Sequence, residues 1–426
     1  VNEVLEARRA GFHVIITDHH EPPPELPEAD ALVNPKQKNC RFPFSELSGT
    51  GVVFFFVIAI RYSLITSGYW KKNTSPNLKK YLDLVALGTV ADVMPLNSVN
   101  RILVRAGTEV LTERIRPGIW ALCELIGLRE GDVTTEDISF RLAPRINAAG
   151  RMGSPKTAAK LLMSRDVQSS LQAATVLEEK NKKRRKIEKS ILPEAVAQCE
   201  VQDQENCSAL VTYKEGWHPG VLGIVASRLC ARFHLPVIAL TDDPNQPGII
   251  KGSGRSAGGI NLFKAVDQCR AILKNFGGHQ QAVGLSLNKD TLSEFIIAFN
   301  RHVGEQVKTI SMYNKVVLID KELQGNETDW HFFSILRQFE PFGEGNPEPV
   351  FLVKNKKLFR VSLVKGDHLR FCLRLNGQTF KGIGFGMGNR LTIAQERVDM
   401  AFTFKHTMYR GKKRIEIMAI ELSLAT

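Results

Sequence analysis

The chain opens with an amphipathic segment at residues 2–10, which gives way to a β-branched run at residues 14–17. This pattern predicts a helix followed by a buried parallel strand with both faces covered. The run stops at Asp18, His19 and His20, and a triple proline soon after prevents a helix from starting at once. Polar side chains at the carboxyl end of such a strand lie where open α/β sheets bind their ligands.

Asp92 ends a second apolar segment. Residues 52–64 and 78–87 predict helices, and the later one leads into a short apolar run that closes at Asp92 and a proline. Asp92 is therefore a candidate to join Asp18, His19 and His20 from a neighbouring strand. The alternative is an aspartate that caps a helix.

The middle of the chain predicts a long helix and then a second α/β domain. Apolar residues at roughly helical spacing favour one helix over residues 170–197 that bridges two domains. Its basic run at residues 180–186 is more typical of a solvated helix face than of a nucleic-acid contact. Farther on, strands at residues 210–212 and 236–240 flank an amphipathic helix at residues 220–233.

Three segments have the composition of anion-binding loops. Residues 143–153 contain two arginines and an amide without an acid, and residues 252–256 and 276–284 are rich in glycine. Glycine lets a backbone approach an anion closely, and Ser and Arg side chains supply donors. We therefore predict three loops that hold phosphate groups.

The pattern changes again beyond a turn-dense boundary at residues 339–349. Short strands are then predicted at residues 350–353, 358–364, 368–375, 378–385, 398–404 and 414–422. Five or six such strands in about 75 residues are typical of a small barrel such as an OB-fold. Phe359, Phe371, Phe380 and Tyr409 are candidates for stacking on bases, although we expect most of the phenylalanines to be core.

The same region holds most of the charge. The 426 residues carry a formal net charge of +13. Residues 353–414 contain 15 Lys and Arg against three acids, a net charge of +12, which leaves +1 for the remainder. A basic module attached to a nearly neutral body indicates a polyanionic partner.

Composition limits the class of protein. A mass of 47.5 kDa with 43% apolar residues is typical of a globular protein with about two to four domains. The seven cysteines include no C-x-x-C pair, which indicates reduced thiols in the cytoplasm and gives no support to a zinc ribbon. The longest apolar run, residues 52–60, has about half the length that a bilayer requires. We expect it to be a core helix, with no membrane partner and no signal peptide.

The residue types at positions 18–20 suit a metal ion. Asp18, His19 and His20 offer one hard oxygen and two imidazoles, a mixture that suits Mn²⁺ and that Zn²⁺ or Fe²⁺ would tolerate. The alternative is a surface loop that contains two adjacent histidines.

These motifs, in this order, resemble the DHH phosphoesterases, and among them the RecJ-like exonucleases specific for single-stranded DNA. The motifs that carry the resemblance are residues 18–20 (DHH), 88–92 (GTVAD), 143–151 (APRINAAGR), 252–256 (GSGRS) and 277–279 (GGH). A carboxy-terminal OB-like domain also belongs to RecJ-like proteins, whereas the small phosphodiesterases of the superfamily lack it. The resemblance covers essentially the whole chain.

The resemblance implies an activity and a role for each motif. The activity is two-metal hydrolysis of single-stranded DNA with Mn²⁺ or Mg²⁺, 5′ to 3′, with release of 5′-mononucleotides in DNA repair and recombination. Asp18, His19 and Asp92 would be metal ligands or their immediate shell, and His20 would lie beside the scissile phosphate as a ligand or electrostatic stabiliser. Residues that would contact the substrate are Arg145, Asn147, Arg151, Ser253, Arg255 and, facing the cleft, His279. A helicase and a single-strand-binding protein are further partners that the resemblance suggests.

The predicted architecture is α/β with four parts. They are an incomplete parallel-sheet DHH domain at residues 1–165, a linking helix at 166–205, a DHHA1-like α/β substrate domain at 206–308 and an OB-fold-like β-barrel at 309–426.

The amino end departs from the family pattern. RecJ-like proteins begin with an aspartate-rich motif of the D-x-D-G type and a second acidic motif, and neither precedes the first helix here. We therefore expect an amino-terminal truncation that is inactive by itself, because about half of the ligands for two ions are present. One alternative is a phosphodiesterase of short oligonucleotides or cyclic dinucleotides, which would not need the basic barrel. The other is a non-catalytic single-strand-binding scaffold, against which the retained metal-type residues argue.

Overall fold

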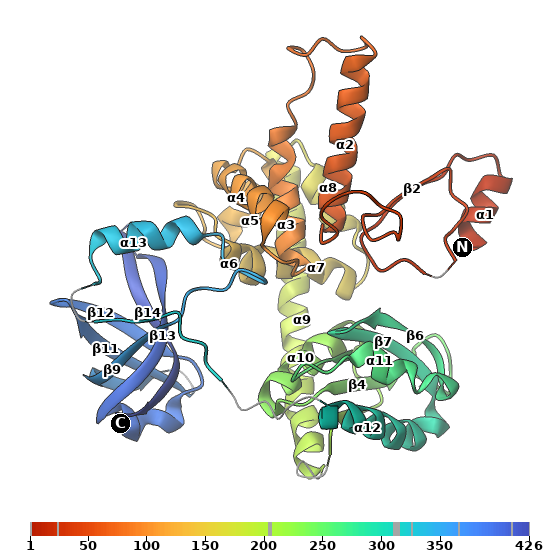
Figure 1. Ribbon diagram of the computed structural model, residues 1–426. Coiled ribbons are helices and arrows are strands. Elements are labelled where there is room, and N and C mark those ends of the chain that lie inside the picture. The colour runs from red at the N-terminus through yellow and green to blue at the C-terminus, as the bar shows by residue number, and fades with distance from the viewer. Residues whose placement is uncertain are drawn as a thin grey trace. The chain divides into compact units, whose positions relative to one another are not determined.

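In the computed structural model, residues 2–425 are described with the exception of residues 24, 203–206, 310–315, 325–326, 365–366 and 410–411. The chain folds as two units (Figure 1). Unit 1 comprises Val1–Ala143 and Val317–Thr426, and unit 2 comprises Pro144–Val316.

The Asp-His-His segment follows a short parallel pair of strands. Helix α1 (Asn2–Arg9) precedes β1 (Ile15–Thr17), and β1 pairs in parallel with β2 (Ala31–Val33). The predicted helix and strand are present, but the expectation of a buried strand is wrong, since Ile15 is 56% exposed. The physical reason is that β1 and β2 form a two-stranded sheet among the described residues, so that its faces stay largely uncovered.

Helix α2 (Gly49–Thr66) is apolar along its length and mostly exposed. Its N-cap Ser48 accepts a hydrogen bond from the Gly51 N–H, and Gly51 and Val52 are its buried residues. The expectation of a core helix therefore holds only for the start of α2, where Val52 joins a core cluster with Leu47 and Leu82, and Phe54 and Phe55 pack against it. By length and composition α2 is the one described helix that would suffice to cross a membrane, a test that core helices of soluble proteins also pass.

Asp92 follows a helix, not the strand end that its sequence suggested. Unit 1 continues with η1 (Leu78–Tyr81), α3 (Leu82–Ala91), α4 (Ser98–Glu113), α5 (Pro117–Leu125), α6 (Thr135–Asp137) and η2 (Ile138–Leu142). Helices α3 and α4 approach closely because position 107 has no side chain. A Cβ atom on Gly107 would lie 2.3 Å from the Leu82 carbonyl oxygen.

The carboxy-terminal part of unit 1 is a seven-stranded sheet in the order β10-β11-β12-β14-β13-β9-β8. Its strands are β8 (Lys321–Glu322), β9 (Phe351–Lys357), β10 (Phe359–Val364), β11 (His368–Leu375), β12 (Gln378–Gly384), β13 (Arg397–Tyr409) and β14 (Lys412–Leu424). Short helices accompany them: α13 (Trp330–Leu336), η5 (Arg337–Phe339), η6 (Gly388–Arg390) and α14 (Leu391–Ala394). All six predicted strands are present, because their alternating apolar side chains form one core around Phe371 and Phe402.

Unit 2 contains a mixed five-stranded sheet in the order β3-β4-β5-β7-β6. Its strands are β3 (Leu210–Tyr213), β4 (Val237–Asp242), β5 (Ile249–Arg255), β6 (Leu273–His279) and β7 (Ala282–Asn288). Its helices are α7 (Ala143–Arg151), α8 (Lys156–Met163), α9 (Val167–Val201), α10 (Pro219–Phe233), α11 (Leu262–Asp267), η3 (Arg270–Ile272), η4 (Lys289–Thr291) and α12 (Leu292–Thr309). The long helix predicted over residues 170–197 is α9.

The three predicted anion-binding loops are largely regular elements. Residues 143–151 form α7, residues 252–255 lie within β5, and residues 276–284 are mostly the hairpin of β6 and β7. In β5, Gly252 has no side chain, and this lets the strand lie close to its neighbour β4. A Cβ atom on Gly252 would lie 2.1 Å from the Ala239 carbonyl oxygen of β4. The glycines that suggested loops are thus required inside a sheet.

Candidate active site

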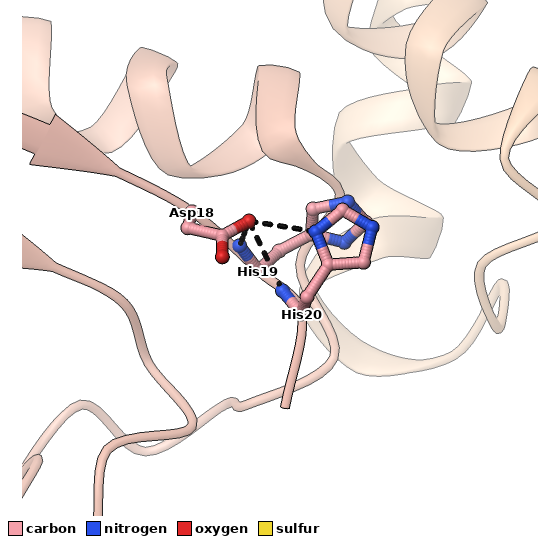
Figure 2. Close-up of side chains that lie close together, drawn as sticks. All are labelled: Asp18, His19 and His20. Carbon is pink, nitrogen blue, oxygen red and sulfur yellow. Dashed lines mark hydrogen bonds and ion pairs between the residues drawn. The ribbon is translucent and has the colours of Figure 1, made fainter. Parts of the chain in front are cut away.

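Asp18, His19 and His20 lie together at the carboxyl end of β1. Their possible ligand atoms all lie within 4.8 Å of one another (Figure 2). The two imidazole centroids are 4.4 Å apart. The parallel pairing sets this position, because Thr17 lies opposite Val33 and the next residues of both strands leave the sheet at the same edge.

Asp18 is the acceptor that orders this turn. Its Oδ1 atom accepts hydrogen bonds from the His19 and His20 backbone N–H groups, at 2.7 and 3.3 Å, and lies 2.7 Å from His20 Nδ1. Burial raises the pKa of Asp18, but the bonds from His20 and the two backbone N–H groups outweigh it, and the pKa is lowered. Asp18 is therefore held as a carboxylate.

Asp92 approaches the cluster from the C-cap of α3. Its Oδ2 atom lies 3.4 Å from Nε2 of His19, whose side chain is 14% exposed. Val93, with φ of +55°, turns the chain immediately after it. Asp92 is thus both a residue at a helix end and a partner of His19. Burial lowers the pKa of His19, although the Asp92 charge acts in the opposite direction.

The donor set fits a divalent metal ion. Two ligand atoms at about 2.1 Å from one ion are about 3.0 to 3.4 Å apart, for octahedral or tetrahedral angles. His19 Nε2 and Asp92 Oδ2 have such a separation. The Asp18 carboxylate accepts a hydrogen bond from Nδ1 of His20, which leaves Nε2 of that ring to bind a metal ion.

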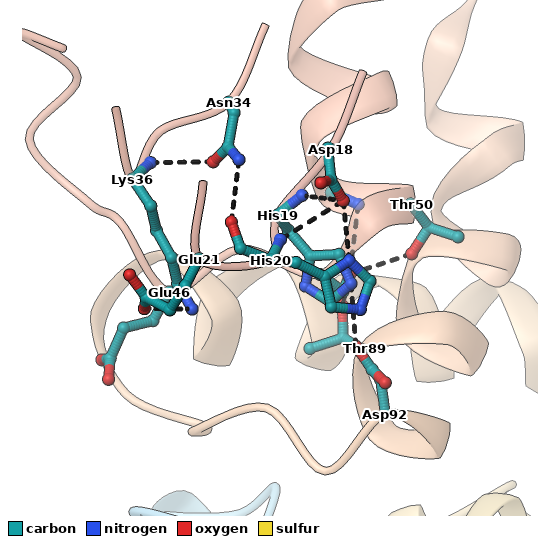
Figure 3. A network of polar contacts seen from close by, with 12 residues as sticks. Asp18, His19, His20, Glu21, Asn34, Lys36, Glu46, Thr50, Thr89 and Asp92 are labelled. Atoms are coloured by element: carbon teal, nitrogen blue, oxygen red, sulfur yellow. Dashed lines mark hydrogen bonds and ion pairs between the residues drawn. The ribbon is translucent and has the colours of Figure 1, made fainter. Parts of the chain in front are cut away.

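Sequence reasoning missed the residues that support the cluster. Asn34, 3% exposed, follows β2 and donates a hydrogen bond to the His20 carbonyl at 2.9 Å (Figure 3). The buried Ser48 hydroxyl bonds the Thr89 and Thr50 hydroxyls at 2.9 and 3.0 Å, joining α2 to α3. The signal for Asn34 is its place directly after a second parallel strand, the same position that Asp18 takes after the first.

In unit 2, the strand register places Ser253, Arg255 and His279 on one face of the sheet. Ser253 lies opposite Gly284, and Arg255 and His279 both lie opposite Ala282. Residues directly opposite in neighbouring antiparallel strands share a face. Arg255 Nη1 donates to the Ser253 hydroxyl at 3.0 Å. This face is therefore polar, with a glycine at its centre that leaves the backbone accessible.

Two arginines of unit 2 form no ion pair with the acids of the described ranges. Arg151 donates to the Gly220 carbonyl at 3.2 Å at the start of α10, and Arg255 donates to the Gly254 carbonyl at 2.7 Å. Burial lowers the pKa of both arginines, and the charge of Arg151 lowers that of Arg255 further. Two partly buried like charges are unfavourable until an anion joins them.

The other two predicted phosphate contacts lie on different sides of α7. Arg145 Nε lies 2.6 Å from Glu178 Oε2 on α9, and both side chains are largely buried. Asn147 is exposed and shares a helix face with Arg151, four residues later. Asn147 and Arg151 therefore form one surface, whereas Arg145 faces α9.

Two of the four aromatic residues proposed to stack on bases belong to the core of the carboxy-terminal sheet. Phe371 and Phe380 are 0% and 4% exposed, so their assignment as stacking surfaces is wrong. They point inward because strand alternation places them on the covered face. Phe359 is partly exposed beneath the guanidinium of Arg374. The side chain of Tyr409 lies outside the described residues.

Comparison with known proteins identifies the family. Residues 1–89 match the model of the DHH family, N-terminal domain, residues 206–305 that of the DHHA1 domain and residues 319–421 that of the RecJ OB domain. The single-stranded-DNA-specific exonuclease RecJ of Dickeya dadantii is 37% identical over 97% of this chain and 74% of its own length. The chain belongs to the RecJ family. The predicted resemblance and fold class are thereby confirmed.

Two RecJ structures from Thermus thermophilus share this fold. The complex with Mn²⁺ has a TM-score of 0.82 at 28% identity, covering 100% of this chain and 60% of that one. The complex with Mg²⁺ has a TM-score of 0.75 at 28% identity, covering 98% of this chain and 61% of that one. The chain thus spans about three fifths of the length of these Thermus RecJ chains.

Proposed function

We propose that this protein is a metal-dependent exonuclease specific for single-stranded DNA, which releases 5′-mononucleotides in the 5′ to 3′ direction during repair and recombination. The observation that carries the proposal is the cluster of Asp18, His19 and His20 with Asp92, in a chain of the RecJ family. The clustered donors indicate hydrolysis, and the family indicates the substrate.

In this proposal Asp18, His19, His20 and Asp92 hold Mn²⁺ or Mg²⁺, the ions named in the Thermus RecJ structures. Bound as a pair, such ions supply hydroxide from water and neutralise charge on the attacking and leaving oxygens. The protein contributes orientation: Asp18 fixes the His20 ring, and Asn34 fixes the His20 backbone. His20, whose side chain is 75% exposed, is placed to reach a substrate phosphate.

The substrate phosphates are proposed to bind residues of unit 2. Arg151 and Arg255 carry charge without a carboxylate partner in the described ranges, and Ser253 adds a hydroxyl beside Arg255. A guanidinium can grip a terminal phosphate through two parallel hydrogen bonds. Further proposed contacts are Asn147, on the Arg151 face of α7, and His279, on the Arg255 face of the sheet. Arg145 would contribute through its ion pair with Glu178, which fixes α7 on α9.

We also propose domain limits and a cellular setting. The limits are residues 1–165, 166–205, 206–308 and 309–426, and the family models that begin at residues 206 and 319 support the last two. A cytoplasmic location, with a helicase and a single-strand-binding protein as partners, would suit a repair nuclease.

The number of metal ligands in residues 1–426 bears on how active this polypeptide would be as a nuclease. Two divalent ions need about twice as many protein ligands as Asp18, His19, His20 and Asp92 supply. We therefore propose that a polypeptide of residues 1–426 alone turns over little substrate, and that one extended upstream by aspartate-rich motifs is active.

Asp92→Ala in the extended polypeptide tests the proposed function. It should abolish mononucleotide release from a single strand in Mn²⁺ and leave the dissociation constant of the strand unchanged, because affinity resides in the arginines and the basic sheet. Asp132→Ala, which removes another exposed acid of unit 1, is the matched control. Parallel loss of binding and cleavage would make Asp92 a structural residue. Binding without cleavage by the unaltered extended polypeptide would instead favour a scaffold, and full cleavage by residues 1–426 would refute the proposed limit.

A further inference from the structure

The carboxy-terminal sheet contains a hollow where β12 and β14 diverge. The two strands pair in parallel from Lys381 opposite Glu416 to Ile383 opposite Met418. Strand β12 begins three residues earlier, at Gln378, and there it is paired with β11 on its other side. The divergence leaves a hollow of about 480 Å³.

Trp330 forms one wall of this hollow, and Figure 1 shows its helix α13 beside β12 and β14. Asp329 caps α13 by accepting a hydrogen bond from the Phe332 N–H at 2.8 Å. Phe333, on the same helix face as Trp330, is 3% exposed and packs 6.0 Å from the Phe380 ring centroid. Trp330 itself is 79% exposed. Helix α13 thus holds a large aromatic surface in water, open to a planar ligand that could stack on it.

The rest of the hollow is polar and basic. We call it the Trp330 pocket, and its remaining exposed side chains are Gln378, Thr379, Lys381 and Arg414. Glu416 is the one acid in its lining. A flat ring, two cations and two hydrogen-bonding groups together suit a nucleobase with its flanking phosphates. An acidic peptide would use the cations but would leave the exposed ring without a matched surface.

We propose that the Trp330 pocket binds one base of the single strand by stacking on the Trp330 ring, with Lys381 and Arg414 contacting neighbouring phosphates. The inference rests on the proposed function and adds a base-binding subsite to it. It also replaces the inward-facing Phe371 and Phe380 with a residue outside the strands as the stacking surface. Arg374 of β11 lies directly opposite the pocket residue Thr379 of β12, so the basic surface continues beyond the pocket.

Intrinsic fluorescence of the full chain tests the subsite. The chain has four tryptophans, of which Trp217 is 5% exposed and Trp70 and Trp120 are partly buried. Stacking should quench the exposed Trp330 when an oligothymidylate is added, but not when an abasic strand with the same phosphates is added. Trp330→Ala should remove the quenching and weaken oligothymidylate binding about 5- to 150-fold, the effect of about 1–3 kcal/mol per stacked base.

Two further variants make the result specific. Trp330→Phe keeps an aromatic face, so it should lose the quenching and retain most of the affinity measured by anisotropy. Tyr69→Ala removes an aromatic of similar exposure, 74%, elsewhere in unit 1 and should change neither quantity. Strand binding that is unchanged in Trp330→Ala, or equal quenching by the abasic strand, would overturn the inference alone and leave a protein partner as the occupant. Absence of strand binding by the unaltered chain would overturn the proposed function as well.

Discussion

His19 combines burial with a carboxylate neighbour, and the balance between them sets its protonation. Burial of the imidazole lowers the pKa of His19, the Asp92 charge raises it, and the net shift is downward. Asp18 also has a lowered pKa, because hydrogen bonds from His20 and the backbone outweigh its burial. Both side chains are therefore deprotonated near neutral pH, the form that binds a metal ion.

The His19 ring should remain neutral at pH values where an ordinary histidine is half charged. Its titration midpoint in the metal-free chain, followed by NMR of the ring protons, should lie below about 6.5. Asp92→Asn should lower the midpoint further, because it removes the attraction that favours the charged ring, while Asp132→Asn should leave it in place. A midpoint above 6.5 would show that the carboxylate outweighs burial, whereas an upward shift in Asp92→Asn would show that the Asp92 charge does not favour the charged ring.

At the scale of elements, periodicity predicted strands well where one face is buried. The strand predicted at residues 368–375 is β11, because its apolar positions fill the core beneath β12. Glycine-rich segments were mispredicted as loops. Glycine has the same sequence signature in a turn and in a strand that packs closely on its neighbour, as Gly252 does against Ala239. That distinction depends on partners remote in sequence.

In the candidate site, too, residues with a local sequence pattern were predicted, and residues whose role depends on partners remote in sequence were missed. Asp18, His19, His20 and Asp92 could be predicted from local patterns, and the structure brings them together. The supporting residue Asn34 was missed, because its role depends on parallel pairing of β1 with β2. The partner of Arg145, Glu178, lies on a different helix and gives no local signal.

Gly107→Ala should destabilise unit 1, because the added methyl would meet backbone. Its Cβ atom would lie 2.3 Å from the Leu82 carbonyl oxygen and 2.5 Å from the Ala86 Cβ atom. We expect a loss of about 1–3 kcal/mol in the free energy of unfolding, as for other overpacked cores. The matched control is Gly150→Ala in α7, where the nearest neighbour is 4.0 Å away. There the better helix propensity of alanine should stabilise by up to about 1 kcal/mol. Equal effects in urea denaturation would contradict the packing argument.

For the whole molecule, the groups for chemistry and for affinity occupy separate parts of the chain. The metal-type residues belong to the first 92 residues, Arg151 and Arg255 belong to unit 2, and residues 353–414 carry +12 of the net +13. A small phosphodiester would not need so much charge in a separate sheet. The distribution therefore favours a long polyanion, whose affinity depends on the release of counterions.

Binding of a single strand to residues 1–426 should weaken steeply with salt. If the basic sheet contacts about four phosphates, the slope of log K against log salt should be roughly −3. Arg370 and Arg374 are exposed on one face of β11, so the double variant Arg370→Gln, Arg374→Gln should flatten the slope by about 1.4, at roughly 0.7 per lost contact. Lys71→Gln, Lys72→Gln, two exposed lysines outside the sheet, should leave the slope unchanged. Fluorescence anisotropy across a salt series measures all three proteins. A slope near zero would favour a small substrate, and a steep slope that survives the β11 changes would move the contacts away from this strand.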